Sequence, residues 1–192
     1  MIRNRTRVIS ARYFEEPIVK VLQVLRVTPT MVTVFGLIFT LGIGYLAAID
    51  ELVIAGILML VSGPIDMLDG ALARRTGKES RFGALLDSLC DRLGEGAVLL
   101  GLLICSYDKG LIMEVVLVFI AMVASFMVSY IRARGEGLGV KAEIGLMTRP
   151  ERLIVLAAGM LTGYLAISLI LITVLSGVTA GQRFVYISQR TK

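Results

Sequence analysis

The chain of 192 residues contains no histidine, only two cysteines and no long polar tract. Without histidine, a general base that works near neutral pH has to be another group, and carboxylates are the obvious candidates. Cys90 and Cys105 both lie in apolar stretches, which argues against a disulfide scaffold. The first long apolar run begins only after Arg26, so we expect no cleavable signal peptide. We therefore expect a single domain, residues 1–192.

Apolar side chains, in contrast, are abundant. Hydrophobic residues make up 56% of the chain and the mean hydropathy is +0.83. Soluble globular domains are typically about 45–50% apolar. The composition therefore predicts an integral membrane protein.

Apolar runs long enough to cross a bilayer recur along the chain. About 20 residues span the hydrocarbon core as a helix. The last uncharged run, 153–182, has 30 residues, which would reach roughly 45 Å as one helix. A break near Thr162 and Gly163 divides it into two spans. The pattern predicts an all-α protein with six transmembrane helices: 29–49, 52–73, 83–107, 114–131 and the two halves of 153–182.

The charges between these runs predict the orientation. With six spans, every Lys and Arg except Lys109 falls on the side that holds both termini, counting the adjoining helix ends. Cytoplasmic loops carry an excess of such residues. We therefore expect a multi-pass protein of the cell membrane with its termini and acidic cluster in the cytoplasm.

Residues 11–26 precede the first span and show helical periodicity. Phe14, Ile18, Leu22 and Leu25 fall on one face, opposite charged side chains. This pattern predicts an amphipathic helix lying on the cytoplasmic interface. It could serve as a simple anchor or border the route by which lipid reaches a site.

Four aspartates lie in one window, 66–91, at the ends of two apolar runs. Asp66 and Asp69 share one helix face, and Asp87 and Asp91 share another, because residues three or four apart are neighbours on a helix. The link between them is short, so we expect the two faces to meet. Ionised carboxylates at membrane depth are costly unless they are paired, metal-bound or in a water-filled cavity. Oxygen donors alone favour Mg²⁺ or Mn²⁺ over zinc, and several carboxylates favour two ions.

Small and basic residues accompany the carboxylates. Gly70, Ala73 and Gly83 lie on the acidic faces, where they would let a bulky ligand approach the backbone. The link 74–82 is basic, which suits a diphosphate because arginine can bind it with two hydrogen bonds.

Together these residues form the pattern D-x2-D-G-x2-A-R-x8-G-x3-D-x3-D over residues 66–91, which resembles the signature of the CDP-alcohol phosphotransferases. Members of that family are six-helix membrane enzymes, generally homodimeric, that make phospholipids. The resemblance implies that Asp66, Asp69 and Asp87 bind one metal ion. It implies that Asp66, Asp87 and Asp91 bind a second, with Asp91 also deprotonating the acceptor hydroxyl. The implied contacts of the CDP-linked lipid are Thr30, Met31, Val32, Thr33, Gly70, Arg74 and Ser80.

The acceptor is indicated by basic residues in the second half of the chain. Arginines at three helix ends on the expected active-site face suit an acceptor that carries its own phosphate. Together with the sequence Arg-Pro-Glu-Arg at 149–152, they resemble the prokaryotic phosphatidylinositol phosphate synthases. That branch implies transfer from CDP-diacylglycerol to inositol 1-phosphate, held by Arg132, Arg152 and Arg183. Relatives often have lysine at the first of these positions.

Other functions remain open at this point. Archaetidylinositol phosphate synthases are similar and differ in the lipid on CDP, and glycerol 3-phosphate is an alternative acceptor that would give phosphatidylglycerol phosphate. A cation transporter also places carboxylates in membrane helices. Here, however, the acids cluster at one face and no inverted repeat is visible. We expect no nucleic-acid partner.

Overall fold

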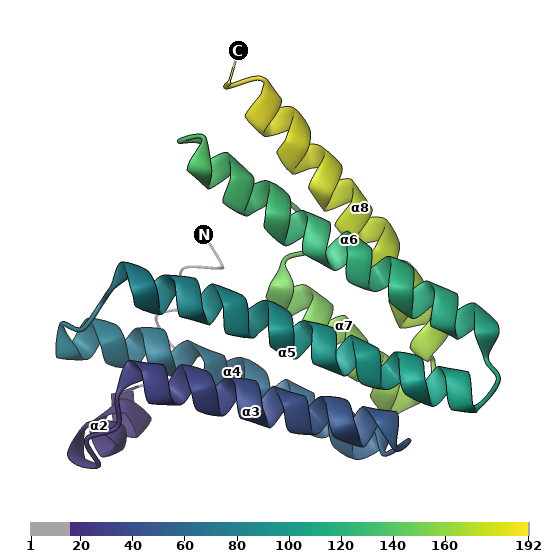
Figure 1. Ribbon diagram of the computed structural model, residues 1–192, viewed down its shortest axis with the longest axis horizontal. Coiled ribbons are helices and arrows are strands. Elements are labelled where there is room, and N and C mark those ends of the chain that lie inside the picture. The colour runs from purple at the N-terminus through teal and green to yellow at the C-terminus, as the bar shows by residue number, and fades with distance from the viewer. Residues whose placement is uncertain (1–15, 192) are drawn as a thin grey trace.

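The computed structural model describes residues 16–191, which fold as helices joined by short connections (Figure 1). Within this range α3 packs against both α4 and α5, α6 and α8 run together, and α7 lies between the two groups. The helices are α2 (Glu16–Val24), α3 (Pro29–Ala48), α4 (Leu52–Thr76), α5 (Arg81–Asp108), α6 (Ile112–Gly137), α7 (Arg149–Thr162) and α8 (Leu165–Ser188).

Four of the described helices are long and apolar enough to cross a membrane: α3, α4, α6 and α8. Helix α5 has 28 residues but carries Asp87 and Asp91 in its first half and Glu95 at its middle, and α7 has only 14 residues. The predicted break in the last apolar run is confirmed, because α7 ends at Gly163 with φ 77°. That left-handed conformation is easily adopted by glycine.

Local sequence signals set the helix ends near the acidic residues. Thr28 caps α3 by accepting a hydrogen bond from the Met31 N–H at 3.2 Å. Ser80 caps α5 in the same way, with its Oγ 2.9 Å from the Gly83 N. Helix α4 ends at Gly77, where φ is 63°. The connection between α4 and α5 is therefore short, as expected.

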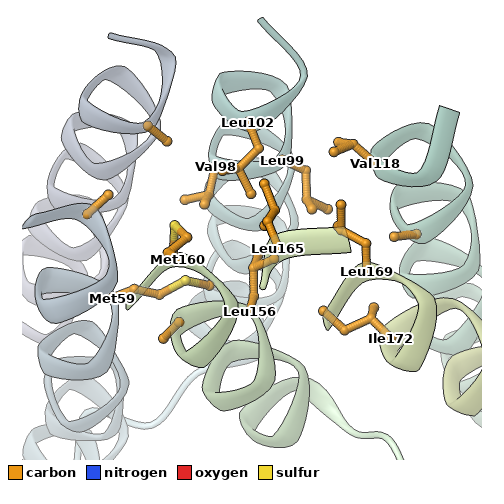
Figure 2. Packing of buried hydrophobic residues seen from close by; sticks show 14 of the residues in the cluster. Met59, Val98, Leu99, Leu102, Val118, Leu156, Met160, Leu165, Leu169 and Ile172 are labelled. Carbon is orange, nitrogen blue, oxygen red and sulfur yellow. The ribbon is translucent and has the colours of Figure 1, made fainter. Parts of the chain in front are cut away.

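The hydrophobic core, shown in Figure 2, is built from helix segments at the end of the bundle away from the four aspartates. All six helices from α3 to α8 contribute to it, and α7 lies at its centre. Its largest fully buried side chains include Ile43, Leu99, Leu102, Met160, Leu169 and Ile172. This apolar packing fixes the positions of the helix halves that carry the polar residues.

Helices α3 and α5 approach each other very closely. A Cβ placed on Gly101 would lie 2.0 Å from the Gly44 carbonyl oxygen, and one on Gly44 would lie 2.6 Å from the Ala97 carbonyl oxygen. Only glycine fits at these two positions. Small residues at such a crossing allow close backbone packing in membrane proteins.

Helix α2 packs against α4 through an apolar face, in line with the predicted amphipathic helix. Val19 is buried there, with Ile18 and Leu22 beside it, whereas Leu25 is 66% exposed. The buried face is therefore centred one residue away from the predicted one. Phe14 lies outside the described residues.

Candidate active site

The four aspartates of the motif line one cavity, which confirms the expectation that the two acidic faces meet. Asp66 and Asp69 come from the second half of α4, and Asp87 and Asp91 from the first half of α5. Over the described residues, however, α4 and α5 are not closely packed neighbours, and each packs against α3 instead. Room between them is expected on physical grounds, because four negative side chains repel one another unless cations lie between them.

Asp69 is held in place by hydrogen bonds. It is 9% exposed and accepts from Thr33 Oγ1 at 2.7 Å and from the Gly70 backbone N–H at 2.6 Å. Thr33 is on α3, so this bond ties α3 to α4 at the cavity. The two bonds engage both oxygens of the Asp69 carboxylate and so fix its orientation.

Arg149, the first residue of α7, lies between the two acidic helices. Its Nη2 is 2.7 Å from Asp66 Oδ2 and its Nη1 is 2.8 Å from Asp91 Oδ1. Asp66 Oδ2 is buried, and the geometry of this ion pair is not that of a directed hydrogen bond. Asp91 also lies 3.4 Å from Arg92 Nη1. One guanidinium thus bridges α4 and α5.

The residues present fit a hard divalent cation in donor type. The four aspartates offer carboxylate oxygens from two helices, and they include a buried oxygen on Asp66 that lacks a hydrogen bond. Among residues 16–191, no three such side chains lie close enough together to hold an ion as they stand. Arg149 lies between two of them, at Asp66 and Asp91, so binding an ion through both would require this guanidinium to move.

A larger cleft opens beside the acidic cavity, with a volume of about 490 Å³. The two share Thr33, Asp69 and Asp87 in their walls. Five of the residues that the family resemblance implies for CDP-lipid binding line this cleft: Thr30, Thr33, Gly70, Arg74 and Ser80. On the side of the α4–α5 link the cleft is lined by charged residues, with Lys78 and Glu79 beside Arg74.

Two residues of that set lie elsewhere. Met31 is 60% exposed and does not line the cleft. Val32 is 8% exposed, packs in the apolar cluster between α2 and α4, and lines the acidic cavity instead. Because successive helix residues point about 100° apart, the four consecutive positions 30–33 cannot all face one cleft.

The three arginines expected at the acceptor have different surroundings. Arg152 is 3% exposed and makes a two-point ion pair with Glu95, at 2.6 Å and 2.8 Å. Arg183 is also 3% exposed and donates to the carbonyl oxygens of Ile144 and Val128, both at 2.8 Å. Arg132 is half-exposed and pairs with a glutamate one turn away on its own helix. Arg183 lies close enough to Arg132 and Arg152 for electrostatic repulsion between their positive charges.

Sequence reasoning missed two members of this arrangement, Glu95 and the bridging role of Arg149. Glu95 continues the acidic face of α5, since it follows Asp91 by four residues and Asp87 by eight. That spacing was available as a signal. No signal in the sequence pairs Glu95 with Arg152, 57 residues away.

The family profile of the CDP-alcohol phosphatidyltransferases matches residues 26–187, which is most of the chain. The chain belongs to the CDP-alcohol phosphatidyltransferase family. It is therefore a transferase of phospholipid synthesis and a multi-pass membrane protein.

Relatives of this CDP-alcohol phosphatidyltransferase fall into two named groups. It is 38% identical to the archaetidylinositol phosphate synthase of Pyrococcus horikoshii over 170 residues, 88% of this chain and 87% of the relative. It is 41% identical to the phosphatidylinositol phosphate synthase of Mycobacteroides abscessus over 134 residues, 69% of this chain and 61% of the relative.

Crystal structures of the Mycobacterium tuberculosis phosphatidylinositol phosphate synthase share the fold of this transferase. The one with CDP-DAG bound is 32% identical, with a TM-score of 0.85 over 91% of this chain and 93% of that one. The one with manganese and citrate is 33% identical, with a TM-score of 0.82 over 89% and 87%.

Proposed function

We propose that this transferase moves the phosphatidyl group of CDP-diacylglycerol to inositol 1-phosphate, giving phosphatidylinositol phosphate and CMP. The observation that carries the proposal is the shared wall between the four-aspartate cavity and the cleft that contains Arg74 and Lys78. A diphosphate in the cleft would lie against the carboxylates, which is where a metal-assisted phosphoryl transfer needs it. The relative crystallised with CDP-DAG supports this choice of donor.

The donor would be bound by the walls of the cleft. Gly70 and Gly83 expose helix backbone there, so a nucleotide can approach closely. Arg74 and Lys78 supply positive charge for the diphosphate, and the capping hydroxyl of Ser80 lies at the same rim. Met31 has no part in this proposal, because it does not line the cleft.

One divalent ion would be bound by Asp66, Asp69 and Asp87. A second would be bound by Asp66, Asp87 and Asp91. The oxygen donors suit Mg²⁺, and Mn²⁺ is present with the M. tuberculosis relative. When bound, such ions neutralise the diphosphate and polarise the phosphorus joined to the lipid. Asp91 would take the proton of the acceptor hydroxyl. Thr33 would hold Asp69 in a fixed orientation throughout.

The acceptor phosphate would be bound near Arg132, Arg152 and Arg183. Arg132 is the most accessible of the three. Arg183 is held by the carbonyl oxygens of Ile144 and Val128, and Arg152 is held by Glu95. Both guanidinium groups therefore occupy fixed positions. A preorganised anion site of this kind favours an acceptor with a phosphate over free inositol or glycerol.

The P. horikoshii relative favours a second version of the same reaction, in which the CDP-linked donor carries archaeal ether lipids. The acidic cavity and the nucleotide cleft would serve both donors equally. Glycerol 3-phosphate, giving phosphatidylglycerol phosphate, is the competing acceptor. A cation transporter is disfavoured because the four carboxylates lie together at one end of the bundle rather than along a path through it.

In the membrane, we propose six spans, α3 to α8, with α2 on the cytoplasmic interface and the active site open to the cytoplasm. The distribution of basic residues supports this orientation. Helices α5 and α7 would complete the six, because both pack within the bundle against helices that are themselves candidate spans. We also propose a homodimer, as in the family that the motif resembles.

The test is an acceptor panel. Purified protein in lipid nanodiscs is given CDP-diacylglycerol or its archaeal ether counterpart, with inositol 1-phosphate, free inositol or glycerol 3-phosphate. CMP release and mass spectrometry of the lipid identify the product. We expect a product with inositol 1-phosphate, none in EDTA and none with Asp91→Asn. Product with glycerol 3-phosphate alone would refute the acceptor, and metal uptake into vesicles without any CMP would refute the enzyme.

A further inference from the structure

The guanidinium of Arg149 lies in the wall of the acidic cavity, between two of its four aspartates. It lies 2.7 Å from Asp66 on α4 and 2.8 Å from Asp91 on α5, and the Arg149 side chain is 26% exposed. No other Lys or Arg lines this cavity among residues 16–191. Arg92 approaches Asp91 only at 3.4 Å and from outside the cavity wall.

The other two aspartates are compensated differently or not at all. Asp69 accepts two hydrogen bonds, from Thr33 and from the Gly70 backbone. Asp87 lines the cavity without a hydrogen bond or ion pair among the described residues. Without a metal ion, Arg149 is therefore the main balancing charge for a cluster of four carboxylates, which would otherwise repel one another.

The oxygens that Arg149 contacts belong to the residues proposed as metal ligands. A divalent ion bound through Asp66 and Asp91 would compete with the guanidinium for those oxygens, and the two cations would also repel each other. We infer that Arg149 is an internal counter-cation, which neutralises the carboxylates in the metal-free enzyme and is displaced from Asp66 and Asp91 when divalent metal binds. This inference rests on the proposed metal site.

A plain structural role for Arg149 predicts different behaviour. If Arg149 only braced α7 against α4 and α5, its removal would lower stability equally with and without metal, and would leave metal affinity unchanged or weaker. A counter-cation instead protects only the metal-free state. Its removal should destabilise the enzyme in EDTA and strengthen metal binding, because the competitor is gone.

The experiment measures Mn²⁺ binding by titration calorimetry and thermal unfolding in EDTA and in saturating Mn²⁺, on protein in nanodiscs. The variants are Arg149→Gln, Arg149→Lys and the charge-matched control Arg190→Gln. Arg190 lies at the same end of the bundle and stacks on Tyr186, away from the cavity. We expect Arg149→Gln to bind Mn²⁺ at least tenfold more tightly than the wild type and to have a lower melting temperature in EDTA but not in Mn²⁺. Arg149→Lys should be closer to the wild type in both measurements, and Arg190→Gln should match the wild type.

Equal or weaker Mn²⁺ binding by folded Arg149→Gln would overturn the inference while leaving the metal site intact. No Mn²⁺ binding by the wild type would overturn both the inference and the proposed metal-dependent function. The two failures are thus distinguishable.

A measurement on the unaltered protein covers the case in which Arg149→Gln does not fold. Phenylglyoxal modifies accessible arginine side chains, and mass spectrometry locates each adduct. We expect Arg149 to react faster in Mn²⁺ than in EDTA, because displacement exposes its guanidinium. Arg152, buried against Glu95, is the internal reference and should stay protected in both. A rate for Arg149 that does not rise with Mn²⁺ would overturn the inference.

Discussion

The ion pair between Glu95 and Arg152 provides the sharpest test of how the site is held. It joins α5 to α7 through two bonds of 2.6 Å and 2.8 Å, and both side chains are nearly buried, at 11% and 4% exposure. Glu95→Gln keeps the shape of the side chain but removes its negative charge, and it replaces one acceptor oxygen by an NH₂ group that donates hydrogen bonds. Leaving a buried guanidinium uncompensated costs about 3–5 kcal/mol.

Thermal unfolding followed by circular dichroism in nanodiscs measures this cost. For chains of 150–250 residues, 1 kcal/mol corresponds to roughly 2–4 °C, so Glu95→Gln should lower the melting temperature by roughly 6–20 °C. The matched control is Glu136→Gln, which breaks an exposed ion pair with Arg132 of similar length, 2.9 Å. Such pairs one turn apart on a helix contribute about 0.3–0.5 kcal/mol, so the melting temperature of the control should stay close to that of the wild type.

The double variant Glu95→Met with Arg152→Met separates the charge from the packing. Replacing both partners by apolar side chains is often close to neutral, so the double variant should be more stable than Glu95→Gln alone. A melting temperature for Glu95→Gln within about 2 °C of Glu136→Gln would refute the reasoning, because it would mean that Arg152 finds compensation elsewhere.

Two further predictions concern the neighbouring packing. Thr33→Val removes the hydrogen bond to Asp69 and should weaken Mn²⁺ binding about 10-fold or more, whereas Thr33→Ser should retain it; calorimetry measures both. Gly101→Ala would place a Cβ 2.0 Å from a backbone oxygen of α3 and should lower the unfolding free energy by about 1–3 kcal/mol. Gly42→Ala, with open space around it, is the control and should be neutral or slightly stabilising in the same melts.

The acidic cavity was predictable from the sequence because its geometry is largely local. Spacings of three and four fix a helix face, and a short link between Gly77 and Ser80 returns the chain to the same end of the bundle. The helix break at Gly163 was predictable for a similar reason, since an apolar run of 30 residues is too long for one span.

The contacts that bring α7 into the site were not predictable in this way. The pairing of Arg149 with Asp66 and Asp91, and of Arg152 with Glu95, depends on how α7 packs between distant helices. Positive charge near helix ends indicated only the side of the membrane and an anionic ligand. Arg183 likewise binds two backbone carbonyl oxygens, and no spacing rule in the sequence points to them.

The shortness of α7 has a consequence for how a lipid substrate meets water. At about 1.5 Å per residue its 14 residues extend roughly 21 Å, against roughly 36 Å for the 24 residues of α8. The segment before α7 is packed against the rest of the protein, with its Ala142 and Met147 buried. We expect the lipid-linked phosphorus of the donor to react below the plane of the surrounding lipid headgroups. The acyl chains of the donor would then stay in the bilayer, while water reaches the phosphorus from the cytoplasm. Slow amide hydrogen exchange over 142–148 in nanodiscs would agree with this depth, and exchange as fast as in an open surface loop would contradict it.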